Sequence, residues 1–206
     1  MINIGNRAVI TTRENFENNG IGVYLHWNGG RDSVEPFLKY CEMRGFRAPD
    51  EDNYGWARLV QVIANFFGMD GLSIGVDTIN NLDCGNGDNG VYIIEGWNIV
   101  GREYAYGEQE GHDFNEMLLA IDKAQPEPLG EYINAKEVPV SDIKVGDKVY
   151  VKTWDSKIKK VEILGIGKDM WVNGFNVKGL PFAEIVNDSK TNPNNYIHTD
   201  TVKIAE

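Results

Sequence analysis

The sequence has few of the residues that make covalent or metal crosslinks. It holds two cysteines, Cys41 and Cys84, and three histidines, His26, His112 and His198. Two cysteines make no disulfide framework and indicate a reduced, cytoplasmic protein. The scattered Cys and His residues lack the paired spacing of a zinc site. There is no run of about 18 apolar residues for a membrane span, and the first residues lack the basic and apolar regions of a signal peptide. We expect no metal and no other cofactor.

The common catalytic and nucleotide-binding motifs are also missing. No P-loop and no G-x-S-x-G elbow occurs, and GVYIIEGWNIVG lacks the G-x-G-x-x-G order. Asp83, Asn86, Asp88 and Asn89 offer oxygen ligands, but the spacing and distal Glu of an EF-hand are absent, so a turn is favoured over a calcium site. We expect Cys84 in this glycine-rich loop to be an exposed, inert thiol, since nearby acids raise its pKa.

Acidic residues dominate one part of the chain. The net charge is −11, and residues 1–130 carry 9 Lys and Arg against 20 Asp and Glu, whereas residues 131–206 carry 11 of each. An acidic surface repels nucleic acid, so a nucleic-acid partner is disfavoured. It is suited to solubility alone or to contact with a basic protein surface.

The first 130 residues predict an acidic α+β domain with an antiparallel sheet and two or three helices. Asp32 or Ser33 can cap the first helix, whose apolar residues follow the i, i+3, i+4 spacing and place Cys41 in the core. Asp52 or Asn53 can cap the second helix. The expected strands lie at 7–12, 22–26, 72–77, 90–95 and 99–106, the helices at 32–44, 54–67 and 114–123, and RENFENNG is expected to be a loop.

Residues 131–206 predict a small all-β domain. Short apolar runs alternate with Gly, Asn and Asp turns, which is typical of a small closed barrel. DIKVGDKVYVKTW resembles the first strand of SH3-like barrels. Lys157, Lys159 and Lys160 with Trp154 and Trp171 permit nucleic-acid binding, but the zero net charge favours a solvated strand edge.

A polar corner stands out between the second strand and the first helix. His26, Trp27, Asn28, Arg31 and Asp32 lie within seven residues around Gly29-Gly30, where glycine lets the backbone reverse. His26 is a candidate acid, base or ligand-binding group, or a structural group bonded to the backbone. Trp27 can stack on a flat ligand or pack internally. We predict a binding site at these five residues and no catalytic residue.

The first domain resembles a family of uncharacterised proteins of phages, prophages and mobile elements of Gram-positive bacteria. The resemblance rests on YLHWNGG, YGWAR, NLDCGNGDNGVYII and W-x-I-V-G-R-E, and it spans residues 7–105. It implies no named activity. Accessory genes of such elements often act on host machinery or host defence, so the resemblance favours such a role.

Three hypotheses follow. The first is a non-enzymatic accessory protein that binds a host protein or ligand through the corner, in the service of counter-defence. The second is a hydrolase that uses His26 with Asp77, Glu95 or Glu103. The third is a sponge that sequesters a small nucleotide through Trp27 stacking and Arg31 pairing. The sequence does not fix the oligomeric state.

Overall fold

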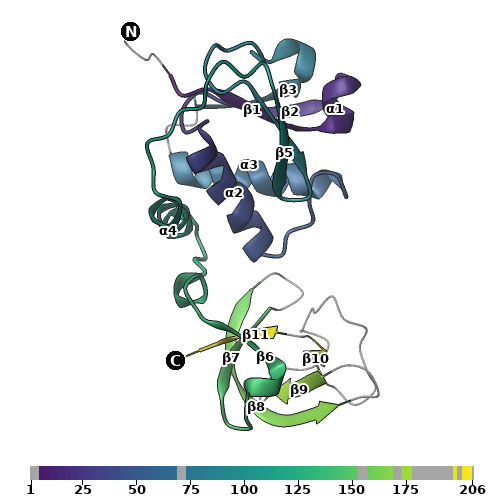
Figure 1. Cartoon of the computed structure of the whole chain (residues 1–206), viewed down its shortest axis with the longest axis vertical. Coiled ribbons are helices and arrows are strands. Elements are labelled where there is room, and N and C mark those ends of the chain that lie inside the picture. The colour runs from purple at the N-terminus through teal and green to yellow at the C-terminus, as the bar shows by residue number, and fades with distance from the viewer. Residues whose placement is uncertain are drawn as a thin grey trace. The chain divides into compact units, whose positions relative to one another are not determined.

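The computed structural model describes residues 5–68, 73–152, 157–168, 173–177, 197–198 and 201–205. Contacts divide the chain into two compact units, Met1–Pro128 and Leu129–Glu206. Figure 1 shows that the first is mixed α+β and that the described part of the second is mainly β. No helix among the described residues is long and apolar enough to cross a membrane.

The first unit contains one five-stranded sheet with the order β3-β2-β1-β4-β5. Its strands are β1 (Ala8–Thr12), β2 (Ile21–Leu25), β3 (Ile74–Thr78), β4 (Val91–Glu95) and β5 (Asn98–Glu103). β2 pairs antiparallel with β1 and β3, and β5 pairs antiparallel with β4. The central β1–β4 pair is parallel, with Val9 opposite Val91. The sheet is therefore mixed, and the expectation of a purely antiparallel sheet was wrong.

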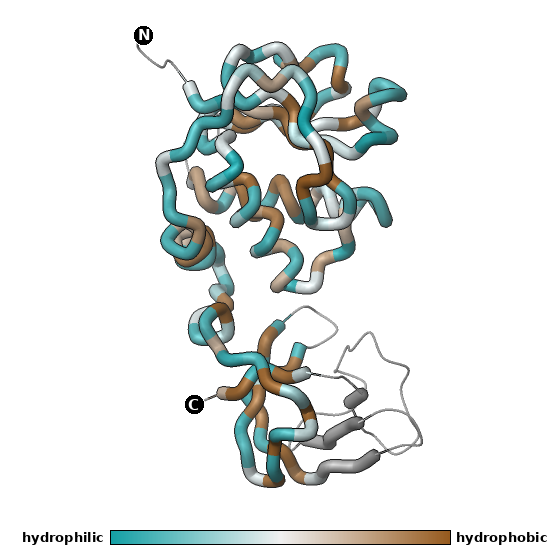
Figure 2. Tube along the Cα trace, in the orientation of Figure 1, coloured by the Kyte–Doolittle hydropathy of each residue, from teal (hydrophilic) through white to brown (hydrophobic). Residues whose placement is uncertain are grey.

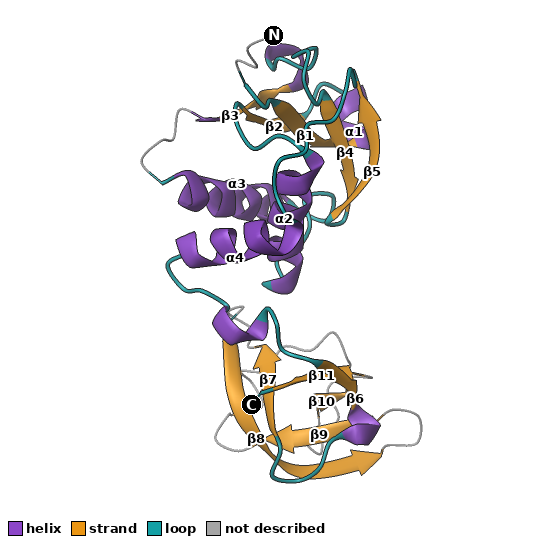
Figure 3. Ribbon diagram, turned by 60° about the vertical axis from the view of Figure 1, so that its left-hand side comes forward, coloured by secondary structure: helices purple, strands orange, loops and turns teal. Residues whose placement is uncertain are grey.

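Both faces of the sheet are covered. Figure 3 places α2 (Arg31–Met43), α3 (Asn53–Phe67) and α4 (Phe114–Ala124) together on one side of it. Val9 and Val91 pack on the other face with Phe16 of the short helix α1 (Arg13–Glu17). Side chains alternate between the faces of a strand. Every residue of β1 is buried, as expected for a central strand with two covered faces.

The helix signals in the sequence were mostly correct, with two exceptions. The Asp52 side chain caps α3 by accepting from Tyr54 N–H, and Gly68 follows its last residue. RENFENNG, expected to be a loop, contains α1, whose N-cap is Thr12. The N-cap of α2 is Gly30 without a side-chain hydrogen bond, so the expected capping role of Asp32 or Ser33 was wrong.

The second unit contains a six-stranded sheet with the order β10-β9-β8-β7-β11-β6. All of its pairs are antiparallel. A cluster of eight buried aliphatic residues, among them Val149 and Ile163, forms its core. The strands are β6 (Glu137–Pro139), β7 (Lys148–Lys152), β8 (Ile158–Lys168), β9 (Asn173–Val177), β10 (Ile197–His198) and β11 (Thr201–Ile204).

No pairing between the described strands joins β10 to β6, so no closed barrel is seen in the part of the chain that the structure describes. Residues 182–186, expected as one of the strands, lie outside the described residues, as do Trp154 and Trp171. Lys157, Lys159 and Lys160 lie at the start of β8, and each has an interaction partner.

Candidate functional site

The corner, residues 26–32, connects the end of β2 to the start of α2. Two other segments press against it. A Cβ at Gly29 would lie 2.6 Å from the backbone nitrogen of Ala8, and a Cβ at Gly30 would lie 2.2 Å from the carbonyl oxygen of Gln109. Both distances are too short for any side chain. The sequence signal was thus correct in marking these glycines, but the close approach of two distant segments explains why glycine is needed there.

His26 and Trp27 form the outward part of the corner. The Trp27 side chain is 45% exposed, and its ring meets the half-buried His26 ring edge-on with centroids 5.1 Å apart. The Nδ1 atom of His26 lies 3.2 Å from the hydroxyl oxygen of Tyr24. The backbone of His26 donates to the Ser73 carbonyl and accepts from Asn6 N–H. The indole therefore projects from a backbone that neighbouring segments hold on both sides.

Asn28, Arg31 and Asp32 instead hold a long segment against the corner. This segment, residues 104–113 between β5 and α4, is called the strap, and Figure 2 shows that most of it is hydrophilic. The Asp32 carboxylate accepts hydrogen bonds from the backbone N–H groups of Gly111 and His112, the second at 2.7 Å. The Asn28 side-chain amide lies 3.2 Å from Nε2 of His112. Asp32 thus caps the strap backbone and not its own helix.

The strongest attachment of the strap is the Glu108 carboxylate. It accepts from Arg31 Nε at 2.8 Å and from the Tyr92 hydroxyl at 2.9 Å, and it lies 3.4 Å from Arg102 Nη1. The side chain of Glu108 is 24% exposed and that of Arg102 is 17% exposed. Three donors from α2, β4 and β5 therefore meet one carboxylate in a mostly buried setting.

The charges of this cluster shift the titration of its members. Burial lowers the pKa of Arg31, but the hydrogen bond and charge of Glu35 and the charge of Glu108 outweigh it, so the pKa is raised. Burial, followed by the Glu108 hydrogen bond and charge, raises the pKa of Tyr92. The cluster thus favours a charged guanidinium and a neutral phenol. The Nε atom of Arg102 is buried and has no hydrogen-bond partner.

The loop considered for calcium is closed by its own hydrogen bonds. The Asn86 side-chain oxygen accepts from the backbone N–H groups of Asp88 and Gly90, and Asp88 pairs with Arg7 at 2.7 Å. Asn89 accepts from Gln109 N–H of the strap at 2.8 Å. Among the described residues, no group of three or more His, Cys, Asp and Glu side chains could hold a metal ion.

The two cysteines differ in environment. Cys41 is fully buried, as expected, and burial raises the pKa of its thiol. Cys84, expected to be exposed, is half-buried, and its thiol lies 3.6 Å from the Ile79 carbonyl oxygen. Burial and then Asp83 raise the pKa of Cys84. Both environments favour the unreactive thiol over the nucleophilic thiolate.

The carboxylates considered for a hydrolase lie away from His26. Asp77 pairs with Gly22, four residues before His26 along β2, and strand geometry makes that separation about 13 Å. Glu103 lies on the edge strand β5 and binds Arg13 at 2.8 Å. Glu95 lies at the far end of β4, past the partner of Thr12. The structure therefore does not bring the expected acid–base pair together.

The nucleotide-sponge hypothesis has a related difficulty. Arg31, expected to pair with a phosphate, already donates to both Glu35 and Glu108. A phosphate would have to replace two carboxylates that hold the same guanidinium. The cluster contains residues that the sequence did not single out, namely Tyr92, Arg102 and Glu108. Tyr92 and Arg102 were expected in a hairpin, where they are direct cross-strand neighbours, but nothing in the local pattern placed Glu108 beside them.

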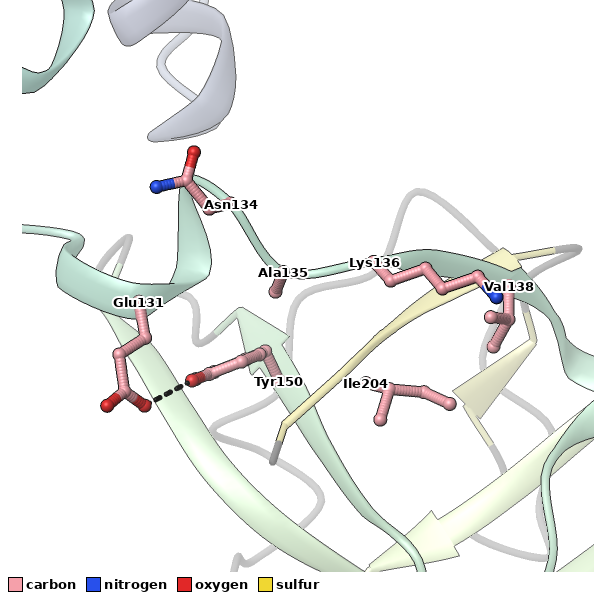
Figure 4. Close-up of a pocket in the computed structure, with 7 residues that line it drawn as sticks. All are labelled: Glu131, Asn134, Ala135, Lys136, Val138, Tyr150 and Ile204. Atoms are coloured by element: carbon pink, nitrogen blue, oxygen red, sulfur yellow. Dashed lines mark hydrogen bonds between the residues drawn. The ribbon is translucent and has the colours of Figure 1, made fainter.

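The second unit has a cavity of its own, of about 480 Å³. Figure 4 shows Tyr150 and Ile204 projecting from two strands beneath Ala135, with the Tyr150 hydroxyl bonded to Glu131. That hydrogen bond measures 3.1 Å. The lining mixes aliphatic and charged side chains of both signs, and it does not select a ligand class.

No protein-family model matches this chain, and the searches of curated proteins and of solved structures found no match. The functional argument therefore depends on the geometry of the corner and on charge.

Proposed function

We propose that this chain is a non-enzymatic accessory protein of a phage or mobile element, and that its first unit binds a host protein. Trp27 is the anchor of the interface. The observation that carries the proposal is the contrast within the corner: the indole is 45% exposed, whereas Asn28, Arg31 and Asp32 are all engaged by intramolecular partners.

The fixed backbone around Trp27 supports this role. Tryptophan is enriched among the residues that dominate binding energy at protein interfaces. Association is weakened by any ordering that it requires of the binding surface. Here the turn is already held by Asn6, by Ser73 and by the strap. A partner would therefore meet an aromatic side chain on a surface that needs little rearrangement.

Charge indicates the kind of partner. The excess of eleven acidic residues lies in residues 1–130, and a basic protein surface is attracted to such a field. We propose that the partner is a basic protein of the bacterial cytoplasm, including nucleic-acid-binding proteins of host defence, and that the interaction counteracts that defence. The resemblance of residues 7–105 to proteins of phages and mobile elements supports the same role.

The finer fold of the second unit also belongs to the proposal. We infer an SH3-like barrel from the run DIKVGDKVYVKTW, and the pairing of β7 with both β8 and β11 supports that inference. Such barrels serve many functions, so this fold adds no specific activity.

A pull-down with single-residue variants tests the binding role. Trp27→Ala should keep the melting temperature and lose the captured basic proteins, because the indole is largely outside the core. Tyr54→Ala is the matched control, since Tyr54 is a 68% exposed aromatic on α3. Arg31 is left intact because its substitution would disturb the Glu108 cluster.

Equal capture by the Trp27→Ala variant and the unmodified protein would reject the proposed site. Small molecules released by denaturing the purified protein are analysed in parallel. An intact nucleotide retained by the unmodified protein would instead support the sponge, and a converted product would support an enzyme.

A further inference from the structure

A cavity of about 380 Å³ lies in the first unit between α2, the β4–β5 hairpin and the start of α4. It is called the α2 pocket. Six of the residues that line it matter for its chemistry: Glu35, Lys39, Glu42, Trp97, Ile99 and Phe114. None of them belongs to the corner, although Glu35 is bonded to Arg31. The pocket is therefore a second, adjacent surface of the same unit.

One part of the lining is apolar and fixed. Trp97 is only 9% exposed, and its indole N–H donates to the Phe46 carbonyl at 2.9 Å. Phe114, the first residue of α4, is 37% exposed. Ile99 is half-buried beside Trp97 on the hairpin. This surface suits the methylene chain of a long side chain.

The other part of the lining is charged and exchangeable. Glu35, Lys39 and Glu42 are spaced by four and three residues and so share one face of α2. Lys39 and Glu42 pair at 2.6 Å, with both side chains 49% exposed. Such exposed pairs add little stability, so Glu42 can exchange Lys39 for another cation. Two carboxylates against one ammonium also leave the lining net negative.

We propose that the α2 pocket receives an arginine side chain of the basic partner. The stem lies on Trp97 and Phe114, and the guanidinium binds the carboxylate of Glu42 with help from Glu35. A guanidinium can bind a carboxylate through two parallel hydrogen bonds, which an ammonium cannot do, and it stacks favourably on aromatic faces. This inference rests on the proposed function, because it specifies the chemistry of the same partner.

The test uses the full chain and two capped pentapeptides, Gly-Gly-Arg-Gly-Gly and the same peptide with citrulline in place of arginine. Citrulline keeps the shape of the side chain and removes its charge. Nuclear magnetic resonance follows the Trp97 indole N–H and the amides of Ile99 and Phe114. The arginine peptide should shift these signals with millimolar affinity, and the citrulline peptide should bind about fivefold more weakly or not at all.

Two variants locate the site. Phe114→Ala and Glu42→Gln should each weaken the arginine peptide about fivefold, because one removes the stacking surface and the other the charged partner. Glu116→Gln is the matched control, since Glu116 is an exposed acid on the same turn as Phe114 but does not line the pocket. It removes the same charge from the same unit and should leave binding unchanged.

Several outcomes would overturn the inference. These are equal binding of the citrulline peptide, equal loss in Glu116→Gln, shifts scattered over the acidic surface, and absence of any shift. Shifts that depend on protein concentration without peptide would mean that a second copy of this chain occupies the pocket. Trp27→Ala should leave peptide binding intact, so loss of capture at the corner and loss of binding at the α2 pocket are separate results.

Discussion

Replacing Glu108 by alanine removes the carboxylate that joins the strap to the rest of the first unit. The Tyr92 hydroxyl, on a fully buried residue, would lose its acceptor at 2.9 Å. Arg102, whose side chain is 17% exposed, would lose its nearest carboxylate, 3.4 Å away. Arg31 would keep Glu35, to which it is bonded at 2.9 Å. The substitution therefore leaves one phenol and one guanidinium without their partner.

The expected loss of stability follows from these exposures. A buried donor without an acceptor costs about 1–3 kcal/mol. The Arg31 pair counts as a surface interaction of at most about 1 kcal/mol, because the Arg31 side chain is 36% exposed. The total is about 3 kcal/mol in the free energy of unfolding, to which Arg102 contributes the least certain share. For a unit of 128 residues this lowers the melting temperature by about 10 °C.

Thermal unfolding and hydrogen exchange would measure the effect. The amides of Gln109, Gly111 and His112 donate to Asn89 and Asp32, and they should exchange at least about tenfold faster once the strap is loosened. Glu108→Gln should lose about half as much stability, because its amide oxygen still accepts from Tyr92 while the charge is gone.

Glu110→Ala provides the matched control. Glu110 is an exposed acid two residues further along the strap, and its loss should change the melting temperature by less than about 2 °C. Equal effects of the two alanine substitutions, or a Glu108→Ala variant as stable as the unmodified protein, would refute the idea that this carboxylate fastens the strap.

Three further predictions concern titration, thiol access and backbone contact. Burial raises the pKa of Tyr40 and Tyr92, so the folded chain keeps protons that the unfolded chain releases above pH 10; stability should fall there by about 1.4 kcal/mol per pH unit for each residue, and Tyr→Phe variants should flatten the denaturation curve. Cys84 should react with a thiol reagent in the native protein and Cys41 only after unfolding, which absorbance of the released product measures. Gly30→Ala should displace the strap and accelerate its hydrogen exchange, whereas unchanged exchange would contradict the 2.2 Å contact.

Features set by local spacing were predictable from the sequence. The apolar positions of α2, α3 and α4 repeat at helical intervals, and turn residues mark where the elements end. The structure confirms these helices with boundaries within a few residues. The β4–β5 hairpin is also confirmed, because its two strands are joined by a short turn.

Features set by distant partners were not predictable. Asp32 was expected to cap its own helix, but its carboxylate is taken by Gly111 and His112 of the strap. Glu108 shows no local pattern that marks it, and its partners Arg31 and Tyr92 come from separate elements. Such pairings depend on how the elements pack, which single-sequence spacing does not report. The same holds for the parallel β1–β4 pair.

The central position of β1 has a consequence for synthesis of the chain on the ribosome. β1 finds β2 soon after both emerge, but its other edge pairs with Val91–Glu95 of β4, which is translated much later. Until then a wholly apolar-faced strand exposes an open row of backbone donors and acceptors, and such rows recruit strands from other chains. A product that stops before Val91 should therefore aggregate or remain with chaperones, whereas one that includes the β4–β5 hairpin can close the sheet.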